Sequence, residues 1–181
     1  MGVITRDLTF KVCLFGEKNV GKSSLIYAIT QNGFNKELRP PPIIDIKTKD
    51  LTINALKIIL QIWILRFDLQ FEFLFPVFLE GISGGIFMYD ITKFSSISNV
   101  KNWITMFTAN LSDDRKDIPL VMVGGKYDLY FKRIVSTEFA QEISQKYKFC
   151  KYFECSSKTG ENVDTLFIYL SKIIMTHFGY I

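Results

Sequence analysis

The stretch GEKNVGKSS, residues 16–24, is the feature that most constrains the fold of this chain. It lies between the apolar run LTFKVCLF at 8–15, which is typical of a strand, and KSSLIYAIT at 22–30, which is typical of a helix. Glycines let the backbone curl so that successive N–H groups point inward, and the helix adds the positive end of its dipole. We therefore predict a phosphate-binding loop between a strand and a helix.

The spacing within this loop assigns chemical roles to its residues. It fits the pattern G-x-x-x-x-G-K-[ST], in which the Lys22 ammonium reaches the β- and γ-phosphates and the Ser23 hydroxyl ligates Mg²⁺. A surface turn can match the pattern by chance, but the strand before it and the helix after it favour a phosphate site. The candidate phosphate-binding residues are Gly16, Lys18, Asn19, Val20, Gly21, Lys22, Ser23 and Ser24, with Ser23 as the metal ligand.

Strand-like apolar runs alternate with helical segments along the rest of the chain. Further strands are predicted at 43–51, 56–64, 84–91, 118–126 and 151–157, and further helices at 95–108, 136–147 and 162–178. No linker or internal repeat interrupts the alternation, so residues 1–181 are expected to form one domain. Such alternation indicates an α/β fold with a mostly parallel sheet and helices on both faces. Ligands then bind beyond the carboxyl ends of the strands.

Composition and charge argue against several classes of function. The formal net charge is only +4 and the basic residues are scattered among acidic ones, so we expect a solvated surface and no nucleic-acid binding. Cys13, Cys150 and Cys155 show no C-x-x-C spacing, which favours buried thiols in a reducing compartment. His177 is the only histidine, which argues against His-based catalytic triads and multi-His metal sites.

The sequence also offers no route into a membrane. No run approaches the ~18 apolar residues that a spanning helix needs, and no signal peptide opens the chain. Arg6 stands where a myristoylation site at Gly2 would need Ser or Thr, and the final MTHFGYI has no cysteine to prenylate. We therefore expect no lipid anchor and a cytoplasmic monomer that meets membranes only through partners.

Two further motifs follow later strands: GGKYD at 124–128 and ECSSKTGEN at 154–162. Together with the phosphate-binding loop, in this order and at strand ends, they resemble the small GTPase family of the Ras superfamily, and its Rab-like branch most closely. IKTKDLTI, LKIILQIW, GGIFMYDIT and NVKNWI are similar to Rab-type segments in the same order, so the likeness covers almost the whole chain. The resemblance implies a six-stranded, mostly parallel sheet flanked by about five helices, which binds GDP or GTP with Mg²⁺.

The resemblance assigns recognition of the base to GGKYD. Asp128 would accept hydrogen bonds from N1–H and the 2-amino group of guanine, a pair of donors that adenine lacks. Lys126 would lay its alkyl stem over the base. Gly125 replaces the family's Asn, which removes a contact to the base and to the phosphate-binding loop. We expect weaker guanine binding rather than a change of base.

Residues from two other segments are expected to complete the base site. By resemblance, Ser156 would brace Asp128. The backbone N–H of Ser157 would meet guanine O6, and Lys158 would cover the other side of the base. Phe34 matches the family's aromatic residue that packs edge-on against the base, although an ordinary core phenylalanine would leave the same pattern.

The sequence departs from the family around the γ-phosphate. The family's Asp-x-x-Gly-Gln segment holds the magnesium's water, donates an N–H to the γ-phosphate and orients the attacking water. Ile64, Phe67 and Asp68 align with those three positions. The Thr of the first switch falls near Pro41, within RPPPIID. We therefore expect very slow or absent intrinsic GTP hydrolysis and a weakened dependence on Mg²⁺.

Two questions stay open at this point. Asp45 or Asp68 could take over metal binding through a rearranged loop. The second question is the role of Lys18, which could obstruct the catalytic arrangement or point to solvent. In the competing hypothesis, Lys18 or Arg66 acts as a cis-acting cation in the manner of an arginine finger. Obstruction or solvation is favoured, because without the Gln such a cation would have little to stabilise.

A run of aromatic residues follows the altered switch segment. The candidates for a partner-binding surface are Phe67, Phe71, Phe73, Phe75 and Phe78. Any one of them could simply cover the sheet, but the group is too large to bury under one short element. We expect an exposed apolar patch that binds a protein partner.

Two classes of function remain. In one, the chain is a switch that hydrolyses GTP to GDP with a partner's assistance. In the other, it is a guanine-nucleotide-binding interaction module whose cycle is broken, and the missing switch residues favour this class. A domain that binds no nucleotide is disfavoured because Lys22, Ser23, Asp128 and Lys158 are all present.

Overall fold

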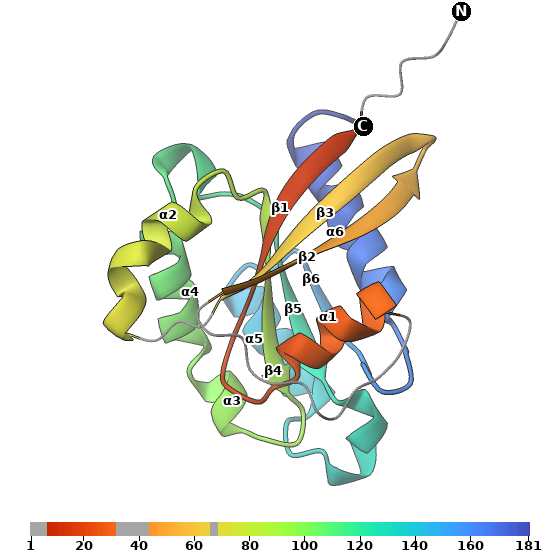
Figure 1. The fold of residues 1–181 in the computed structure, drawn as a ribbon. Helices are drawn as coiled ribbons and strands as arrows, with labels where there is room; N and C mark the ends of the chain where they lie inside the picture. Colours follow the sequence, from red (N-terminus) through yellow and green to blue (C-terminus); the bar gives the residue numbers. More distant parts are fainter. Residues whose placement is uncertain (1–6, 32–43, 66–68) are drawn as a thin grey trace, which may run out of the picture.

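The sheet of this protein has six strands, and the computed structural model describes residues 7–31, 44–65 and 69–181 of the chain (Figure 1). The strands are β1 (Leu8–Phe15), β2 (Ile44–Ile53), β3 (Leu56–Leu65), β4 (Gly84–Asp90), β5 (Leu120–Gly125) and β6 (Lys151–Glu154). Their order across the sheet is β2-β3-β1-β4-β5-β6. The β2–β3 pair is antiparallel and the other pairs are parallel.

Helices cover both faces of this sheet (Figure 1). The α-helices of the described ranges are α1 (Lys22–Gln31), α2 (Phe75–Leu79), α3 (Ser95–Ser98), α4 (Val100–Ala109), α5 (Thr137–Lys146) and α6 (Val163–His177). Short 3₁₀ turns occur at η1 (Leu69–Leu74), η2 (Asp113–Arg115) and η3 (Tyr127–Lys132). Residues of α1 and α6 join one buried cluster, and residues of α2 to α5 join the other. The predicted α/β fold with a six-stranded, mostly parallel sheet is confirmed.

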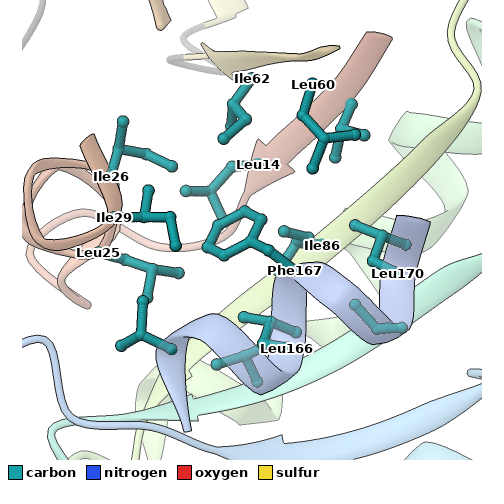
Figure 2. Close-up of a cluster of buried hydrophobic side chains, with 14 of the residues drawn as sticks. Leu14, Leu25, Ile26, Ile29, Leu60, Ile62, Ile86, Leu166, Phe167 and Leu170 are labelled. Atoms are coloured by element: carbon teal, nitrogen blue, oxygen red, sulfur yellow. The ribbon is translucent and has the colours of Figure 1, made fainter. Parts of the chain in front are cut away.

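The cluster under α1 and α6 fixes the position of the first helix against the sheet. Figure 2 shows side chains of both helices pointing toward the strands around Phe167. Phe167 and Leu14 are both fully buried. Large-to-small substitutions at such positions cost roughly 3–5 kcal/mol for a phenylalanine. This packing holds the amino-terminal end of α1 at the edge of the sheet where β1 ends.

One predicted helix is interrupted. The sequence predicts a helix over 95–108, but the chain forms α3 and α4 with Asn99 between them. Asn99 has φ −90° and ψ 11°, outside the helical region, and its Nδ2 lies 3.4 Å from Glu17 Oε1. Asparagine often leaves the helical conformation when its side chain has a polar partner nearby, which accounts for the break.

The carboxyl ends of the parallel strands bring the three motifs to one edge of the sheet. β1 leads into the phosphate-binding loop, β5 into GGKYD and β6 into ECSSKTG. The strands run parallel from β1 through β4 and β5 to β6, so their carboxyl ends lie side by side. The three motifs therefore lie together at this edge of the sheet, where the sequence predicts the candidate site.

Candidate nucleotide-binding site

The loop between β1 and α1 is folded around the ammonium of Lys22. Lys22 Nζ donates hydrogen bonds to the carbonyl oxygens of Gly16 and Glu17, each over 2.7 Å. Gly16 and Gly21 have φ values of 135° and 111°, a region that favours glycine. A Cβ on Gly16 would also overlap the carbonyl oxygen of Met88. The chain therefore needs glycine here to bring the loop down onto β4.

The rest of the loop presents polar groups at the start of α1. Ser23 and Ser24 lie in the first helical turn and are half-buried, whereas Val20 is buried. Lys18 and Asn19 are exposed. A helix start with inward backbone N–H groups and a lysine is suited to hold phosphate oxygens.

The second residue of the loop is anchored to α4. Glu17 Oε1 accepts hydrogen bonds from Trp103 Nε1 over 3.3 Å and from Asn99 Nδ2 over 3.4 Å. These partners lie 86 and 82 residues away along the chain, so the sequence analysis missed them. The contact ties the loop's position to that of α4.

The three motifs surround a cavity of about 260 Å³. Its lining residues are Val20, Gly21, Ser24, Met88, Lys126, Asp128, Leu129, Ser157 and Lys158. Seven of these were predicted from the sequence, and Met88 and Leu129 were not. The volume lies just below the roughly 300–1,000 Å³ that is typical of pockets for small organic ligands.

Asp128 is held at the cavity by the neighbouring loop. Ser156 Oγ donates to Asp128 Oδ1 over 2.7 Å, and Ser156 is fully buried. The same Oγ accepts from the backbone N–H groups of Lys158 (3.2 Å) and Thr159 (3.1 Å). The predicted bracing of Asp128 by Ser156 is therefore present in the structure, and it fixes the direction in which the carboxylate faces.

Lys126 is fixed by an acidic residue at the end of β4. Its backbone is left-handed, with φ 65° and ψ 37°, and its Nζ lies 2.5 Å from Asp90 Oδ2. Asp90 is buried, and its other oxygen accepts from the N–H (2.8 Å) and hydroxyl (2.7 Å) of Thr92. The ion pair orients the stem of Lys126 along the cavity wall.

A half-buried polar network lies beside Gly124, and no motif of the sequence pointed to it. Arg133 binds both carboxylate oxygens of Glu154, over 2.6 and 2.7 Å, and the Tyr152 hydroxyl donates to Glu154 over 2.5 Å. Burial alone would raise the pKa of Glu154, but hydrogen bonds from Arg133 and Tyr152 outweigh it and hold that pKa below its ordinary value. Burial also raises the pKa of Tyr89, whose hydroxyl lies 2.7 Å from that of Tyr152.

Ile64 is the residue that the sequence analysis aligned with the family's metal-side carboxylate. Ile64 lies at the end of β3 and is 1% exposed. Asp45 faces it across the β2–β3 ladder and forms an ion pair with Lys47 over 3.5 Å. Among the described residues, no group of three His, Cys, Asp or Glu side chains could hold a metal ion. Of the residues considered as metal ligands, Ser23 and Asp45 lie within the described part of the chain and Asp68 does not.

Several predicted residues lie outside the part of the chain that the structure describes. These are Phe34, Pro41, Arg66, Phe67 and Asp68, together with the side chain of Phe71. Their proposed roles remain predictions.

The aromatic segment after β3 is divided between surface and interior. Phe73 is 74% and Val77 62% exposed, whereas Phe75 is 1% exposed. Phe75 and Leu79, four residues apart, share the buried face of α2, and Phe78 is partly buried against the core. The prediction that Phe75 belongs to an exposed patch is therefore wrong.

The α-helices of the described ranges do not include one with both the length and the apolar character to cross a membrane.

Comparison with known proteins covers most of the chain. Residues 11–176 match the family model described as the Ras family. Ras-related protein Rab-8B of Homo sapiens is 33% identical over 172 residues, which cover 95% of this chain and 81% of that protein. Ras-related protein Rab-27B of Bos taurus is 32% identical over 179 residues, covering 93% and 81%. Ras-related protein SEC4 of Candida albicans is 32% identical over 168 residues, covering 93% and 78%.

Proposed function

Because the chain belongs to the Ras family, as a Rab-like small GTP-binding protein, we propose that the cavity at the strand ends is its guanine-nucleotide site. We further propose that the protein acts as a switch or interaction module whose intrinsic GTP hydrolysis is very slow or absent. The observation that carries the first proposal is the carboxylate of Asp128, which lines the cavity and is held there by Ser156.

The geometry supports guanine over adenine as the base. The Ser156 hydroxyl occupies one oxygen of Asp128, and the carboxylate retains lone pairs for donors in the cavity. Guanine presents N1–H and a 2-amino group as adjacent donors, whereas adenine has an unprotonated N1 and would leave the carboxylate without a partner. Lys126 and Lys158 line the same cavity, where their stems can cover the two faces of a purine.

The phosphate-binding loop supports binding of the nucleotide's charged end. Lys22 bridges two carbonyl oxygens of the loop, and these hydrogen bonds hold its ammonium at the phosphate-binding loop. Of the remaining predicted members of the loop, Ser23 and Ser24 lie in the first turn of α1, where the helix dipole favours anions, and the others precede the helix.

Slow hydrolysis is proposed because of the residue at the end of β3. Ile64 is aliphatic and buried, and it can neither hold a metal-bound water nor accept a proton. Each ~1.4 kcal/mol of lost transition-state stabilisation lowers a rate tenfold. Intrinsic turnover in small GTPases is already on the order of 10⁻⁴ s⁻¹. A partner that supplies the missing groups is the second candidate mechanism.

Members of the family bind GTP or GDP with Mg²⁺, and the residues of this chain fit that ion only in part. Ser23 offers a hydroxyl at the phosphate-binding loop, and nucleotide phosphates would supply further oxygens. By resemblance, Ile64 aligns with the family's carboxylate, and Ile64 offers no oxygen to the ion. We therefore propose that Mg²⁺ contributes less to nucleotide affinity than in relatives, which a titration of GDP affinity against Mg²⁺ would test. A Mg²⁺-dependent gain as large as that of Rab-8B would contradict this.

The nucleotide proposals are tested by releasing what the purified full chain holds. Denaturation followed by chromatography should yield GTP, and a single-turnover assay of GTP-loaded protein should give a rate below 10⁻⁴ s⁻¹ in order of magnitude. Lys22→Met is the matched control and should retain no nucleotide. GDP together with an ordinary family rate would contradict slow hydrolysis. The absence of any guanine-nucleotide binding would contradict the site itself.

The exposed part of the aromatic segment is proposed as a surface for a protein partner. Phe73 and Val77 are exposed apolar side chains on η1 and α2, close to the altered switch segment. The double variant Phe73→Ser/Val77→Ser should bind less of a hydrophobic dye, whereas Phe94→Ser, at an exposed phenylalanine before α3, should keep dye binding at this segment. Equal dye binding by wild type and the double variant would remove support for this surface.

A further inference from the structure

Met88 lies under the phosphate-binding loop, where no motif of the sequence pointed to it. It is in β4, opposite Val123 of β5, and it is 1% exposed while lining the cavity. Its Cε approaches two glycines from different motifs. A Cβ on Gly21 would lie 3.3 Å from this Cε, and a Cβ on Gly125 would overlap it. The methionine methyl group therefore lies between the phosphate-binding loop and the end of β5.

The space beside Gly125 is closed by packing and not by backbone conformation. Gly125 does not have a left-handed φ, so its backbone would accept other residues. A Cβ there would also lie 3.1 Å from the Val20 carbonyl oxygen and 3.3 Å from that of Tyr89, which are tight contacts. The overlap with Met88 is the most severe, and it comes from the far end of a flexible side chain.

We propose that Met88 and Gly125 are a size-matched pair, in which the Met88 side chain fills the volume that a residue at position 125 would take and makes this wall of the base pocket apolar. The inference rests on the proposed guanine-nucleotide site. Resemblance places an asparagine at position 125, which offers two donors and an acceptor, whereas a thioether offers only a weak acceptor. The pair thus removes the side-chain amide donor that an asparagine would bring to the base pocket. A side chain at position 125 would also lie next to the Val20 carbonyl oxygen.

The pair also determines which part of a purine the protein can read. Asp128 is positioned for the N1 and 2-amino edge, and the imidazole ring lies away from that edge in any guanine so bound. The wall formed by Val20, Gly21 and Met88 remains for the imidazole half. A wall without a side-chain donor gains nothing from the N7 lone pair. The site should therefore accept 7-deazaguanine nucleotides, in which N7 is replaced by C–H, as readily as guanine nucleotides.

Nucleotide affinities of four proteins test the pair: wild type, Gly125→Asn, Met88→Val and Gly125→Asn/Met88→Val. Valine suits a strand and lacks the reach of the methionine methyl group. Gly125→Asn alone should weaken GDP binding about tenfold, because Met88 must move. The double variant should bind GDP about tenfold more tightly than wild type, because the amide regains a hydrogen bond. The proposal would be overturned if the two substitutions had additive effects on GDP affinity, so that Gly125→Asn alone tightened GDP binding as much as the double variant does.

The choice of nucleotide gives a second arm. Wild type should bind GDP and 7-deaza-GDP within about twofold of one another, since no donor distinguishes them. A tenfold preference of wild type for GDP would show a polar wall and overturn the proposal.

A stability cycle keeps the test independent of nucleotide binding. Gly125→Ala adds only a Cβ, and it should lower the melting temperature more in the wild-type background than in combination with Met88→Val, where only the tight contacts to the carbonyl oxygens of Val20 and Tyr89 remain. Equal losses in both backgrounds would contradict the pair even if Gly125→Asn fails to fold. If the wild-type protein binds no guanine nucleotide, the proposed function is contradicted. If the stability cycle is still non-additive, the packing of Met88 against position 125 stands.

Discussion

Ser156 Oγ donates a hydrogen bond to Asp128 Oδ1 over 2.7 Å, and the two residues lie 28 positions apart in the chain. The bond joins the loop after β6 to the loop after β5. Because Ser156 also accepts from the backbone of Lys158 and Thr159, one buried hydroxyl orders both loops. The bond therefore orients the carboxylate that would read the base, and such ordering within the protein lowers the cost of binding.

Replacement of Ser156 by alanine should weaken GDP binding about fivefold to tenfold, because a net hydrogen bond is worth about 1 kcal/mol. The melting temperature should also fall, since two backbone N–H groups lose their acceptor. Isothermal titration and thermal unfolding measure the two effects. Ser157→Ala is the control and should leave both nearly unchanged, because resemblance assigns only the Ser157 backbone to the base. An unchanged affinity in Ser156→Ala would show that Asp128 needs no brace.

Replacement of Asp128 by asparagine should transfer the preference from guanine to xanthine nucleotides. The amide presents a donor where the carboxylate had an acceptor, and xanthine carries a carbonyl oxygen in place of the 2-amino group. Ser156 can still donate to the amide oxygen. In competition binding, wild type should prefer GDP over XDP and Asp128→Asn should prefer XDP over GDP. Each preference should be at least tenfold, on the basis of about 1.4 kcal/mol for one exchanged hydrogen bond. A uniform loss for both nucleotides would place the base elsewhere.

The anchoring of the phosphate-binding loop to α4 should govern how fast nucleotide leaves. Trp103→Phe keeps an aromatic ring but removes the donor to Glu17. We expect nucleotide release to accelerate roughly fivefold, as about 1 kcal/mol of hydrogen bonding is lost. Stopped-flow displacement of a fluorescent GDP measures the rate. Lys101→Gln, on the exposed side of α4, serves as the control. Equal release rates in Trp103→Phe and wild type would mean that the hydrogen bond from Trp103 does not control nucleotide release.

Much of the fold could be predicted because its signals are local. The apolar run from Leu8 to Phe15 is bounded by Asp7 and Gly16, and β1 has the same limits. The helix predicted over 136–147 opens on Ser136, whose Oγ accepts from the Phe139 N–H over 3.2 Å as a helix cap. Such patterns depend on neighbours within one turn, so the sequence displays them directly.

The features that the sequence did not reveal depend on distant contacts. Phe75 is buried because α2 packs with the face that carries Phe75 against the core. α2 is too short for its hydrophobic periodicity to show which face is buried. The position of Met88 beneath Gly21 and Gly125 depends on the register of β4 against β5 and on the height of the loop above them. A residue pattern at fixed spacing carries no information on either.

The Glu154 network should make stability sensitive to acid. The pKa of Glu154 is lowered in the folded protein, because hydrogen bonds from Arg133 and Tyr152 and the Arg133 charge outweigh the effect of burial. A lowered folded pKa means that the unfolded chain takes up the proton first. The stabilisation is therefore present above the ordinary value of 4.5 and is lost as pH falls through the lower folded pKa. Glu154→Gln should melt below wild type at pH 7, and this difference should shrink as pH drops below 4.5. The control variant is Glu142→Gln, at an exposed position of α5, and the difference between its melting temperature and that of wild type should not depend on pH in this way. A difference in melting temperature between wild type and Glu154→Gln that stayed constant across this pH range would mean that the charge of Glu154 does not stabilise the fold.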